Sequence, residues 1–229
     1  MKLAKRLAAV SGYVPIGSVV ADIGTDHALL PISLIESGIC ERVIATDVNA
    51  GPLKAAEQAV AARSLTGVID LRLGDGLLPL AVGEADVIVL AGMGSKTIID
   101  IFTASPEILE KTQRLVLQPM VDSDVLRLWL ADNNWRIAGE KLVREDSRLY
   151  QVIVAEPGRE PVTDPLLLSL GPRLFEERDP LLPLYLKQLT ERYRRALAGI
   201  RAGKSSEAKE KATLLEGKLK NIEEMVKCL

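Results

Sequence analysis

Four turns in the first half of the chain carry the side chains that could do chemistry. The first is Ala21-Asp22-Ile23-Gly24-Thr25-Asp26-His27-Ala28, in which an apolar run ends at an Asp-x-Gly turn followed by an acid and the only histidine. The other three are Ala45-Thr46-Asp47-Val48-Asn49, Leu73-Gly74-Asp75-Gly76 and Ala91-Gly92-Met93-Gly94. Each turn follows an apolar run, so we expect all four at the carboxyl edge of one sheet, where α/β proteins bind ligands.

The spacing of these turns favours a nucleoside cofactor that lacks phosphate. Asp47 lies 23 residues beyond Gly24, near the ~20-residue spacing at which an acid binds a ribose diol. A dinucleotide would bring its pyrophosphate to the first turn, but Asp26 and Ala28 occupy the expected glycine positions, and an anionic Asp26 would repel it. S-adenosylmethionine offers a cationic sulfonium and ammonium, which an acid-lined turn attracts. We therefore predict S-adenosylmethionine as the cofactor.

The turns divide into a cofactor set and an acceptor set. We predict cofactor binding by Asp22, Gly24, Thr25, Asp47, Val48, Asp75 and Gly76, and an acceptor pocket lined by Asp26, His27, Gly92, Met93 and Gly94. The sequence leaves simpler roles open, because these acids and His27 could each cap or close their own turn. No residues show metal-ligand spacing, so we expect no metal.

The elements that must position these turns follow an α/β pattern. Short β-branched runs alternate with helical patterns, which is typical of a doubly wound, mostly parallel, Rossmann-like sheet. The expected strands are 19–24, 42–48, 69–74, 85–91 and 114–118, and the expected helices are 27–37, 50–64, 95–103 and 122–133. Two further runs, 135–143 and 150–155, are close enough in sequence to form an antiparallel hairpin at the edge of the sheet.

A different pattern begins after residue 158. Five prolines between residues 161 and 183 interrupt the chain, and two amphipathic helical stripes follow, separated by Gly203-Lys204-Ser205-Ser206. Each stripe has apolar residues three or four apart, so the two helices can bury them against each other as a coiled-coil hairpin. We predict a catalytic domain at 1–158 and a linker with a helical-hairpin domain at 159–229.

The composition of the chain limits the class of protein but does not identify a binding partner. The net charge is only −2, although residues 159–229 hold 14 Lys and Arg against 11 Asp and Glu, so the tail is mildly basic. Cys40 and Cys228 lie far apart, and no run reaches the ~20 apolar residues of a membrane span. We expect a cytoplasmic protein with no membrane partner; its oligomeric state stays open, with a monomer as one alternative.

The ordered motifs resemble one known family. "ADIGTDHALLP", "ATDVN", "GDGL", "AGMG" and Gln118-Pro119, followed by a helical-hairpin tail, look like the bacterial tRNA adenine-22 N1-methyltransferases, which are class I Rossmann-like enzymes that use S-adenosylmethionine. The resemblance covers the whole chain. It implies methyl transfer to N1 of an adenosine in the D-arm region of tRNA, with the tail helping to hold the RNA.

The residues themselves are compatible with a ring nitrogen as acceptor. N1 of adenine already has an in-plane lone pair, so its attack needs alignment more than a general base. The N/D-P-P-Y/F element that clamps an exocyclic amine is absent, since Gly92-Met93-Gly94-Ser95 stands in its place. Other possibilities remain: a methyltransferase for a small molecule, a catalytically silent module that binds RNA or protein and, more remotely, a nucleotide-dependent dehydrogenase.

Basic residues at both ends of the chain are candidate RNA contacts. Lys2, Lys5 and Arg6 lie in a predicted amino-terminal helix, and Arg192 and Arg195 lie in the first tail helix. Such residues often form only a solvated helix face, but in an RNA enzyme they can bind phosphates. Few aromatic residues are available to stack on a flipped base, which favours a folded RNA as substrate.

Overall fold

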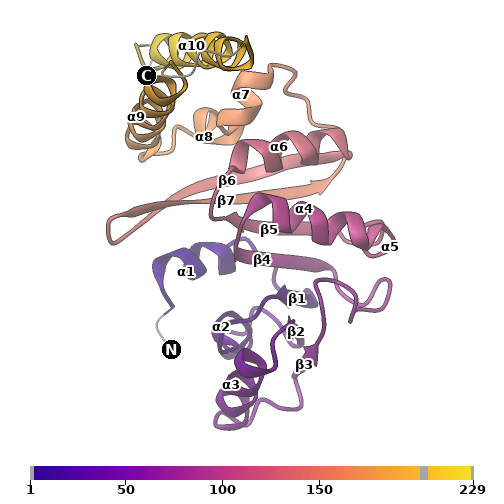
Figure 1. Ribbon diagram of the computed structural model, residues 1–229. Coiled ribbons are helices and arrows are strands. Elements are labelled where there is room, and N and C mark those ends of the chain that lie inside the picture. Colours follow the sequence, from indigo (N-terminus) through magenta and orange to yellow (C-terminus); the bar gives the residue numbers. More distant parts are fainter. Residues whose placement is uncertain (1–2, 202–205, 228–229) are drawn as a thin grey trace. The chain divides into compact units, whose positions relative to one another are not determined.

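A computed structural model of the protein describes residues 3–201 and 206–227. The elements in chain order are α1 Lys5–Ser11, β1 Val20–Ile23, α2 Leu29–Glu36, β2 Val43–Asp47, α3 Ala50–Ala61, β3 Ile69–Leu73, β4 Val87–Met93, α4 Ser95–Ala104, α5 Pro106–Leu109, β5 Arg114–Pro119, α6 Ser123–Asp132, β6 Trp135–Glu145, β7 Arg148–Pro157, α7 Pro165–Leu170, α8 Pro172–Glu176, α9 Leu182–Arg201 and α10 Ser206–Lys227 (Figure 1). They divide into two compact units, Met1–Arg173 and Leu174–Leu229.

The described residues of the first unit form one seven-stranded sheet. Its strand order is β3-β2-β1-β4-β5-β7-β6, with β1 to β5 parallel and β7 antiparallel to both of its neighbours. This confirms the predicted Rossmann-like sheet with an antiparallel edge. The chain runs outward from β1 to β3 and then crosses back to β4 beside β1. The strand order therefore reverses between β1 and β4, which is where open α/β sheets bind ligands.

Helices cover both faces of the sheet because successive strand residues point to opposite sides. In β4, for example, Ile88 and Leu90 pack in a cluster with residues of α4, α5 and α6, whereas Val87 and Val89 pack with residues of α1 and α2. A third cluster joins α2 and α3 to β2 and β3. Figure 1 shows the same division, with α1 to α3 on one face and α4 to α6 on the other. Burial on both faces explains why β4 is a continuous apolar run from Val87 to Ala91.

A buried ionic cluster fixes the segment that follows β7. Arg127 of α6 and Glu140 of β6 are fully buried and joined by a 2.6 Å hydrogen bond from Nε to Oε1. Arg127 also donates to the Ser169 carbonyl oxygen at 3.0 Å, while Glu140 accepts from the Arg173 backbone N–H at 2.9 Å. Arg173 in turn pairs with Glu160 at 2.9 Å. Because these bonds tie residues 160–173 to the sheet, the compact unit extends beyond the predicted boundary at 158.

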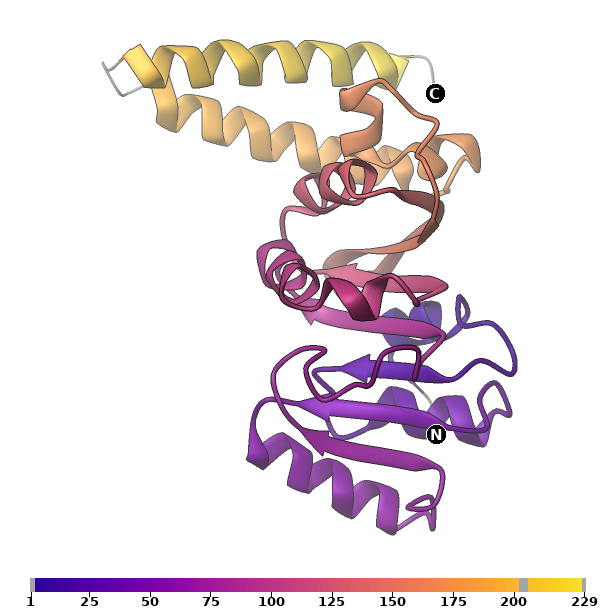
Figure 2. The same ribbon diagram turned by 90° about the vertical axis from the view of Figure 1, so that its right-hand side faces the viewer.

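The second unit contains the predicted helical hairpin. α9 and α10 lie side by side and run in opposite directions (Figure 2). Leu189 and Leu197 of α9 and Ile222 of α10 are buried, and Arg194 pairs with Glu223 at 2.6 Å across the two helices. The hairpin prediction is therefore confirmed.

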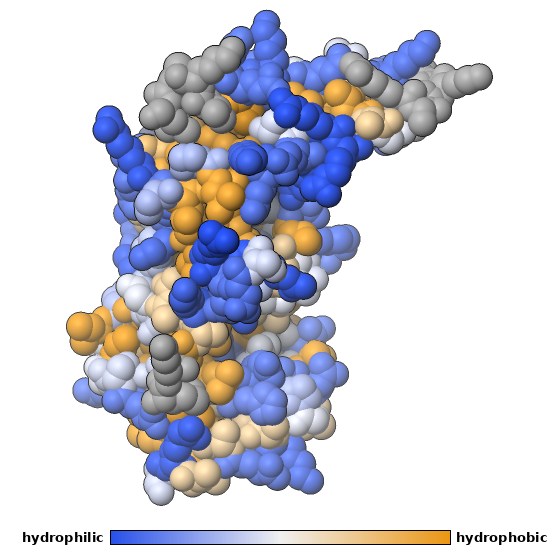
Figure 3. Space-filling model, turned by 90° about the vertical axis from the view of Figure 1, so that its left-hand side faces the viewer, coloured by the Kyte–Doolittle hydropathy of each residue, from blue (hydrophilic) through white to orange (hydrophobic). Residues whose placement is uncertain are grey.

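Figure 3 shows that one face of the molecule carries apolar side chains among hydrophilic ones. Apolar side chains are expected on protein surfaces as well as in cores.

Candidate functional site

The first turn is built from backbone conformations that few side chains tolerate. β1 ends at Ile23, Gly24 follows with φ 77°, and His27 and Ala28 both have positive φ values, 54° and 51°. The helix expected to begin at residue 27 begins at Leu29 instead, because these two left-handed residues extend the turn. His27 is therefore a turn residue whose side chain is exposed, and not part of α2.

Close packing explains the glycine at position 24. A Cβ added to Gly24 would lie 2.2 Å from the Cε atom of Met93, so the β1 turn and the end of β4 are in direct contact. The register of β4 against β5 shifts between Ala91 and Met93, where Gly92 has φ 87°. This bulge leaves Gly92 exposed at the end of the strand. The predicted cofactor and acceptor turns are thus neighbours.

Hydrogen bonds hold the first three turns together. The backbone N–H groups of Gly24 and Thr25 both donate to the carbonyl oxygen of Thr46, at 2.8 and 2.9 Å. The N–H of Gly74 donates to the carbonyl oxygen of Asp47 at 3.0 Å, which fixes the third turn against the second. The N–H groups of Gly24 and Thr25 are therefore used in hydrogen bonds within the protein.

The four turns surround one cavity of about 400 Å³ at the carboxyl edge of the sheet. This volume is within the range of about 300–1,000 Å³ that is usual for small-molecule pockets. Its lining residues come from β1, β2 and β4, from the turns after β1, β2 and β3, and from α1 and α4: Arg6, Ile23, Gly24, Asp26, Thr46, Asp47, Val48, Asn49, Gly74, Asp75, Gly76, Ala91, Gly92, Met93, Thr97 and Ile101.

Eight of the twelve predicted cofactor and acceptor residues line this cavity: Gly24, Asp26, Asp47, Val48, Asp75, Gly76, Gly92 and Met93. Asp47 is nearly buried, and its Oδ1 accepts the N–H of Asn49 at 2.7 Å, which orients the carboxylate. Val48 and Asp75 are exposed beside it. A carboxylate, an apolar side chain and a second acid are thus grouped where the sequence predicts ribose and adenine.

Four predicted residues lie behind or beside the cavity. Asp22 and Thr25 are buried under the first turn, and burial, with a smaller contribution from the charge of Asp47, raises the pKa of the Asp22 carboxyl to about 6. His27 lies 3.5 Å from Asp26, measured from Nε2 to Oδ1, on the exposed side of the turn. Gly94 is the N-cap of α4.

The predicted RNA contacts are spread over the chain. Lys2 lies outside the described residues. Lys5 is exposed on α1, and Arg192 and Arg195 are exposed on α9. Arg6 differs from them, because it is partly buried and lines the cavity.

The sequence did not indicate that Gln118 contacts the site, and it suggested that Arg6 lies on a solvated helix face. Gln118, at the end of β5, is fully buried, and its Oε1 accepts a 2.7 Å hydrogen bond from Nη1 of Arg6. The motif Gln118-Pro119 was visible in the sequence, but nothing local connected it with α1.

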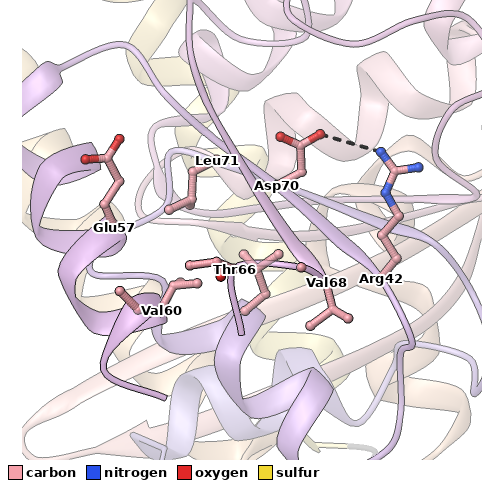
Figure 4. Close-up of a pocket in the computed structure, with 10 residues that line it drawn as sticks. Arg42, Glu57, Val60, Thr66, Val68, Asp70 and Leu71 are labelled. Atoms are coloured by element: carbon pink, nitrogen blue, oxygen red, sulfur yellow. Dashed lines mark hydrogen bonds and ion pairs between the residues drawn. The ribbon is translucent and has the colours of Figure 1, made fainter. Parts of the chain in front are cut away.

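A larger cavity, about 600 Å³, lies elsewhere (Figure 4). It is formed by Arg42, residues of α3 and residues 66–71, at the amino end of β3, and so at the opposite edge from the four turns. Its charged residues Arg42 and Asp70 face each other at 3.5 Å. Parallel sheets bind ligands at the carboxyl ends of their strands, so we do not assign a function to this cavity.

The site near the four turns suits S-adenosylmethionine. The acids Asp26, Asp47 and Asp75 line the cavity, and an acid-lined cavity attracts a cofactor that carries two cationic groups. Among the described residues no group of three or more His, Cys, Asp or Glu side chains could hold a metal ion. No helix in the described part of the chain is long and apolar enough to cross a membrane.

The fold, with a cavity at the switch point of the sheet, is that of a Rossmann-like methyltransferase. In agreement, a family model described as a methyltransferase domain matches residues 3–153. The tRNA (adenine(22)-N(1))-methyltransferase of Bacillus subtilis is 37% identical over 83% of this chain and 81% of its own length. The chain belongs to the tRNA (adenine(22)-N(1))-methyltransferase family, as the sequence resemblance indicated.

Solved structures agree over nearly the full chain. The crystal structure of the B. subtilis m1A22 tRNA methyltransferase is 31% identical, has a TM-score of 0.90 and covers 98% of this chain and 99% of its own. A Streptococcus pneumoniae protein described as a putative tRNA (m1A22) methyltransferase, solved in complex with S-adenosylmethionine, is 31% identical, has a TM-score of 0.87 and covers 98% of this chain and all of its own. The likeness therefore includes the helical tail.

Proposed function

We propose that the protein transfers a methyl group from S-adenosylmethionine to N1 of adenosine 22 in tRNA. The observation that carries the proposal is the acid-lined cavity at the β1/β4 switch point, where Asp26 stands in place of a phosphate-binding glycine. Family membership supports the choice of tRNA and of the position within it.

Different residues along the cavity bind the ribose, the adenine and the methionine part of the cofactor. Asp47 binds the ribose diol, and Val48, Asp75 and Gly76 surround the adenine. The first turn holds the methionine part, with Gly24 leaving space beside Met93. Asp22 and Thr25 support that turn from below.

The part of the cavity near the end of β4 favours a ring nitrogen as the methyl acceptor. The bound cofactor supplies a methyl group on a cationic sulfonium, which the N1 lone pair can attack directly. Gly92 and Gly94 let the base approach the end of β4 closely, and no amine-clamping side chain follows that strand. Asp26 and His27, beside this approach, contact the base; the Asp26 carboxylate would accept from the adenine amino group and favour the cation formed on N1.

The tail is assigned to RNA binding. We keep the division into a catalytic domain, 1–158, and a linker with a helical hairpin, 159–229, as a proposal about function. Lys5 of α1 and the exposed Arg192 and Arg195 of α9 are phosphate contacts in this proposal. Methylation of tRNA also fits a cytoplasmic location.

The test is nucleoside analysis after incubation with labelled S-adenosylmethionine and an unmodified tRNA transcript. We expect label in 1-methyladenosine, and none in a matched transcript with guanosine at position 22. Label in another nucleoside would reject the acceptor atom. Cofactor binding without tRNA labelling would favour a small-molecule acceptor, and absence of cofactor binding would favour a silent RNA-binding or protein-binding module.

A further inference from the structure

The turn that follows β5 borders the predicted acceptor pocket. β5 is the neighbour of β4 in the sheet, and its last residue, Pro119, pairs with Met93. The next two residues, Met120 and Val121, therefore lie at the same carboxyl edge as the four turns. Cγ2 of Val121 is 3.6 Å from the point that a Cβ on Gly94 would occupy. The turn after β5 is thus next to the end of β4, where the proposed function places the methyl acceptor.

This turn exposes two large apolar side chains. Met120 is 42% exposed and Val121 is 56% exposed. Single exposed apolar residues are common on proteins, so exposure alone does not indicate a site. These two residues, however, are adjacent to each other and bonded through the backbone to Met93, which lines the cavity. The border of the site on the side of β5 is therefore apolar, in contrast to the acids of the cofactor cavity.

Hydrogen bonds hold the turn in one position. The N–H of Met120 donates to the carbonyl oxygen of Met93 at 2.8 Å, and Oγ of Ser95 donates to the carbonyl oxygen of Val121 at 2.8 Å. Ser95 is fully buried at the start of α4, so its hydroxyl needs this partner. The turns after β4 and β5 are therefore fixed to each other, and the side chain of Ser95 joins them.

An apolar border suits a purine whose N1 must keep its lone pair free. Methyl transfer needs N1 aligned with the sulfonium methyl group, and a hydrogen-bond donor facing N1 would occupy the lone pair that attacks. The N–H of Met120 is already bonded to Met93, so it does not compete for that lone pair. Aliphatic and thioether groups can pack on the face of a base without touching its edges, and sulfur makes favourable contacts with aromatic rings.

The site turns offer no aromatic side chain for the same purpose. Proteins that hold a splayed-out base usually stack it on an aromatic ring. None of the four site turns and none of residues 119–122 contains Phe, Tyr or Trp. The large apolar groups that the turn after β5 presents beside the acceptor pocket are those of Met120 and Val121.

We infer that Met120 and Val121 form the surface on which the target adenine packs, and that Ser95 positions this surface. The inference rests on the proposed function, because it needs an adenosine as the methyl acceptor at the end of β4. It adds the turn after β5 to the four turns that the sequence indicated.

Substitutions that change polarity at nearly constant size test the packing contact. Met120→Gln and Val121→Thr keep the length or shape of each side chain but make it polar. We expect each variant to lower kcat/KM for methylation of a tRNA transcript about 3- to 10-fold, which is part of what packing on a base usually contributes. The affinity for S-adenosylhomocysteine, measured by calorimetry, should change less than about twofold, because neither residue lines the cofactor cavity.

A transcript that lacks the base separates a base contact from a backbone contact. With S-adenosylhomocysteine present, fluorescence anisotropy measures binding to a tRNA with adenosine at position 22 and to a matched tRNA with an abasic nucleotide there. We expect Met120→Gln to bind the adenosine tRNA about 3- to 10-fold more weakly than the unmodified protein and to bind the abasic tRNA equally well.

Two more variants test positioning and provide the control. Ser95→Ala removes the hydrogen bond to Val121, so it should lower the preference for the adenosine tRNA over the abasic tRNA about 2- to 5-fold. A loss of folded protein would weaken binding of both tRNAs equally. Val125→Thr is the matched control, because Val125 is an exposed valine on α6, and it should leave rates and affinities unchanged. Thermal melting of each variant shows whether the fold is retained.

Each other outcome overturns the inference in a recognisable way. An equal loss for both tRNAs in Met120→Gln would assign the turn to the RNA backbone, and weaker S-adenosylhomocysteine binding would assign it to the cofactor. Normal methylation by both Met120→Gln and Val121→Thr would reject the base contact and leave the proposed function standing. If the unmodified protein did not methylate the adenosine tRNA, the proposed function would fail together with the inference.

Discussion

Asp22 offers a measurable link between the first turn and pH. Its side chain is 6% exposed at the end of β1, and burial raises its pKa from 3.8 to about 6. Between these two values the folded state holds a proton that the unfolded state has released, so raising the pH removes stability. One pKa unit corresponds to about 1.4 kcal/mol, so the full effect is about 3 kcal/mol, lost as the pH rises from about 4 to 6.

The substitution Asp22→Asn removes this titration and keeps the shape of the side chain. We expect the free energy of unfolding of the variant, relative to the unmodified protein, to rise by about 2 kcal/mol between pH 4.5 and 7.5. Urea unfolding at fixed pH values measures the difference, and equal m-values show that the two proteins unfold in the same way. A difference that stays constant with pH would refute the argument from burial.

The same titration tests the cofactor role of Asp22. S-adenosylhomocysteine keeps the α-ammonium group of the cofactor, and this cation favours the ionised carboxylate, so S-adenosylhomocysteine should bind the unmodified protein about tenfold more weakly at pH 5 than at pH 7, since one pKa unit is tenfold. Asp22→Asn should lose this dependence. Calorimetry at both pH values is the assay, and identical pH dependence in the two proteins would remove Asp22 from cofactor binding.

Three other substitutions test separate parts of the site and fold. Asp47→Ala should weaken S-adenosylhomocysteine binding more than about tenfold with unchanged melting, because a hydrogen-bonded carboxylate is lost; unchanged affinity in calorimetry would reject the ribose assignment. Asp26→Ala should lower the rate of tRNA methylation more than about tenfold with the fold intact, and near-normal turnover would exclude Asp26 from the mechanism. Arg127→Met should reduce the free energy of unfolding by about 3–5 kcal/mol, because Glu140 is left as an uncompensated buried charge. Denaturant unfolding measures this loss, which the double variant Arg127→Met with Glu140→Leu should largely recover.

The amino-acid sequence alone determined the sheet and the edge that carries the site. Apolar β-branched runs and helical spacing are local properties of the sequence. The spacing between Gly24 and Asp47 is also local, and it led to the prediction that Asp47 binds a ribose. The antiparallel edge followed from the short separation between the last two strands, and the helical hairpin from its two apolar stripes. The missing phosphate-binding glycines indicated the type of cofactor.

Tertiary structure decided which polar side chains meet. Arg6 reads as one of several bases on a helix, and only folding brings it to Gln118, 112 residues away, inside the cavity. Likewise, Arg127, Glu140 and Arg173 look like surface charges in the sequence, yet they form a buried cluster. Hydrophobic patterns repeat at a fixed local period, whereas a hydrogen bond between distant charged groups leaves no such period, and for that reason only the folded chain shows it.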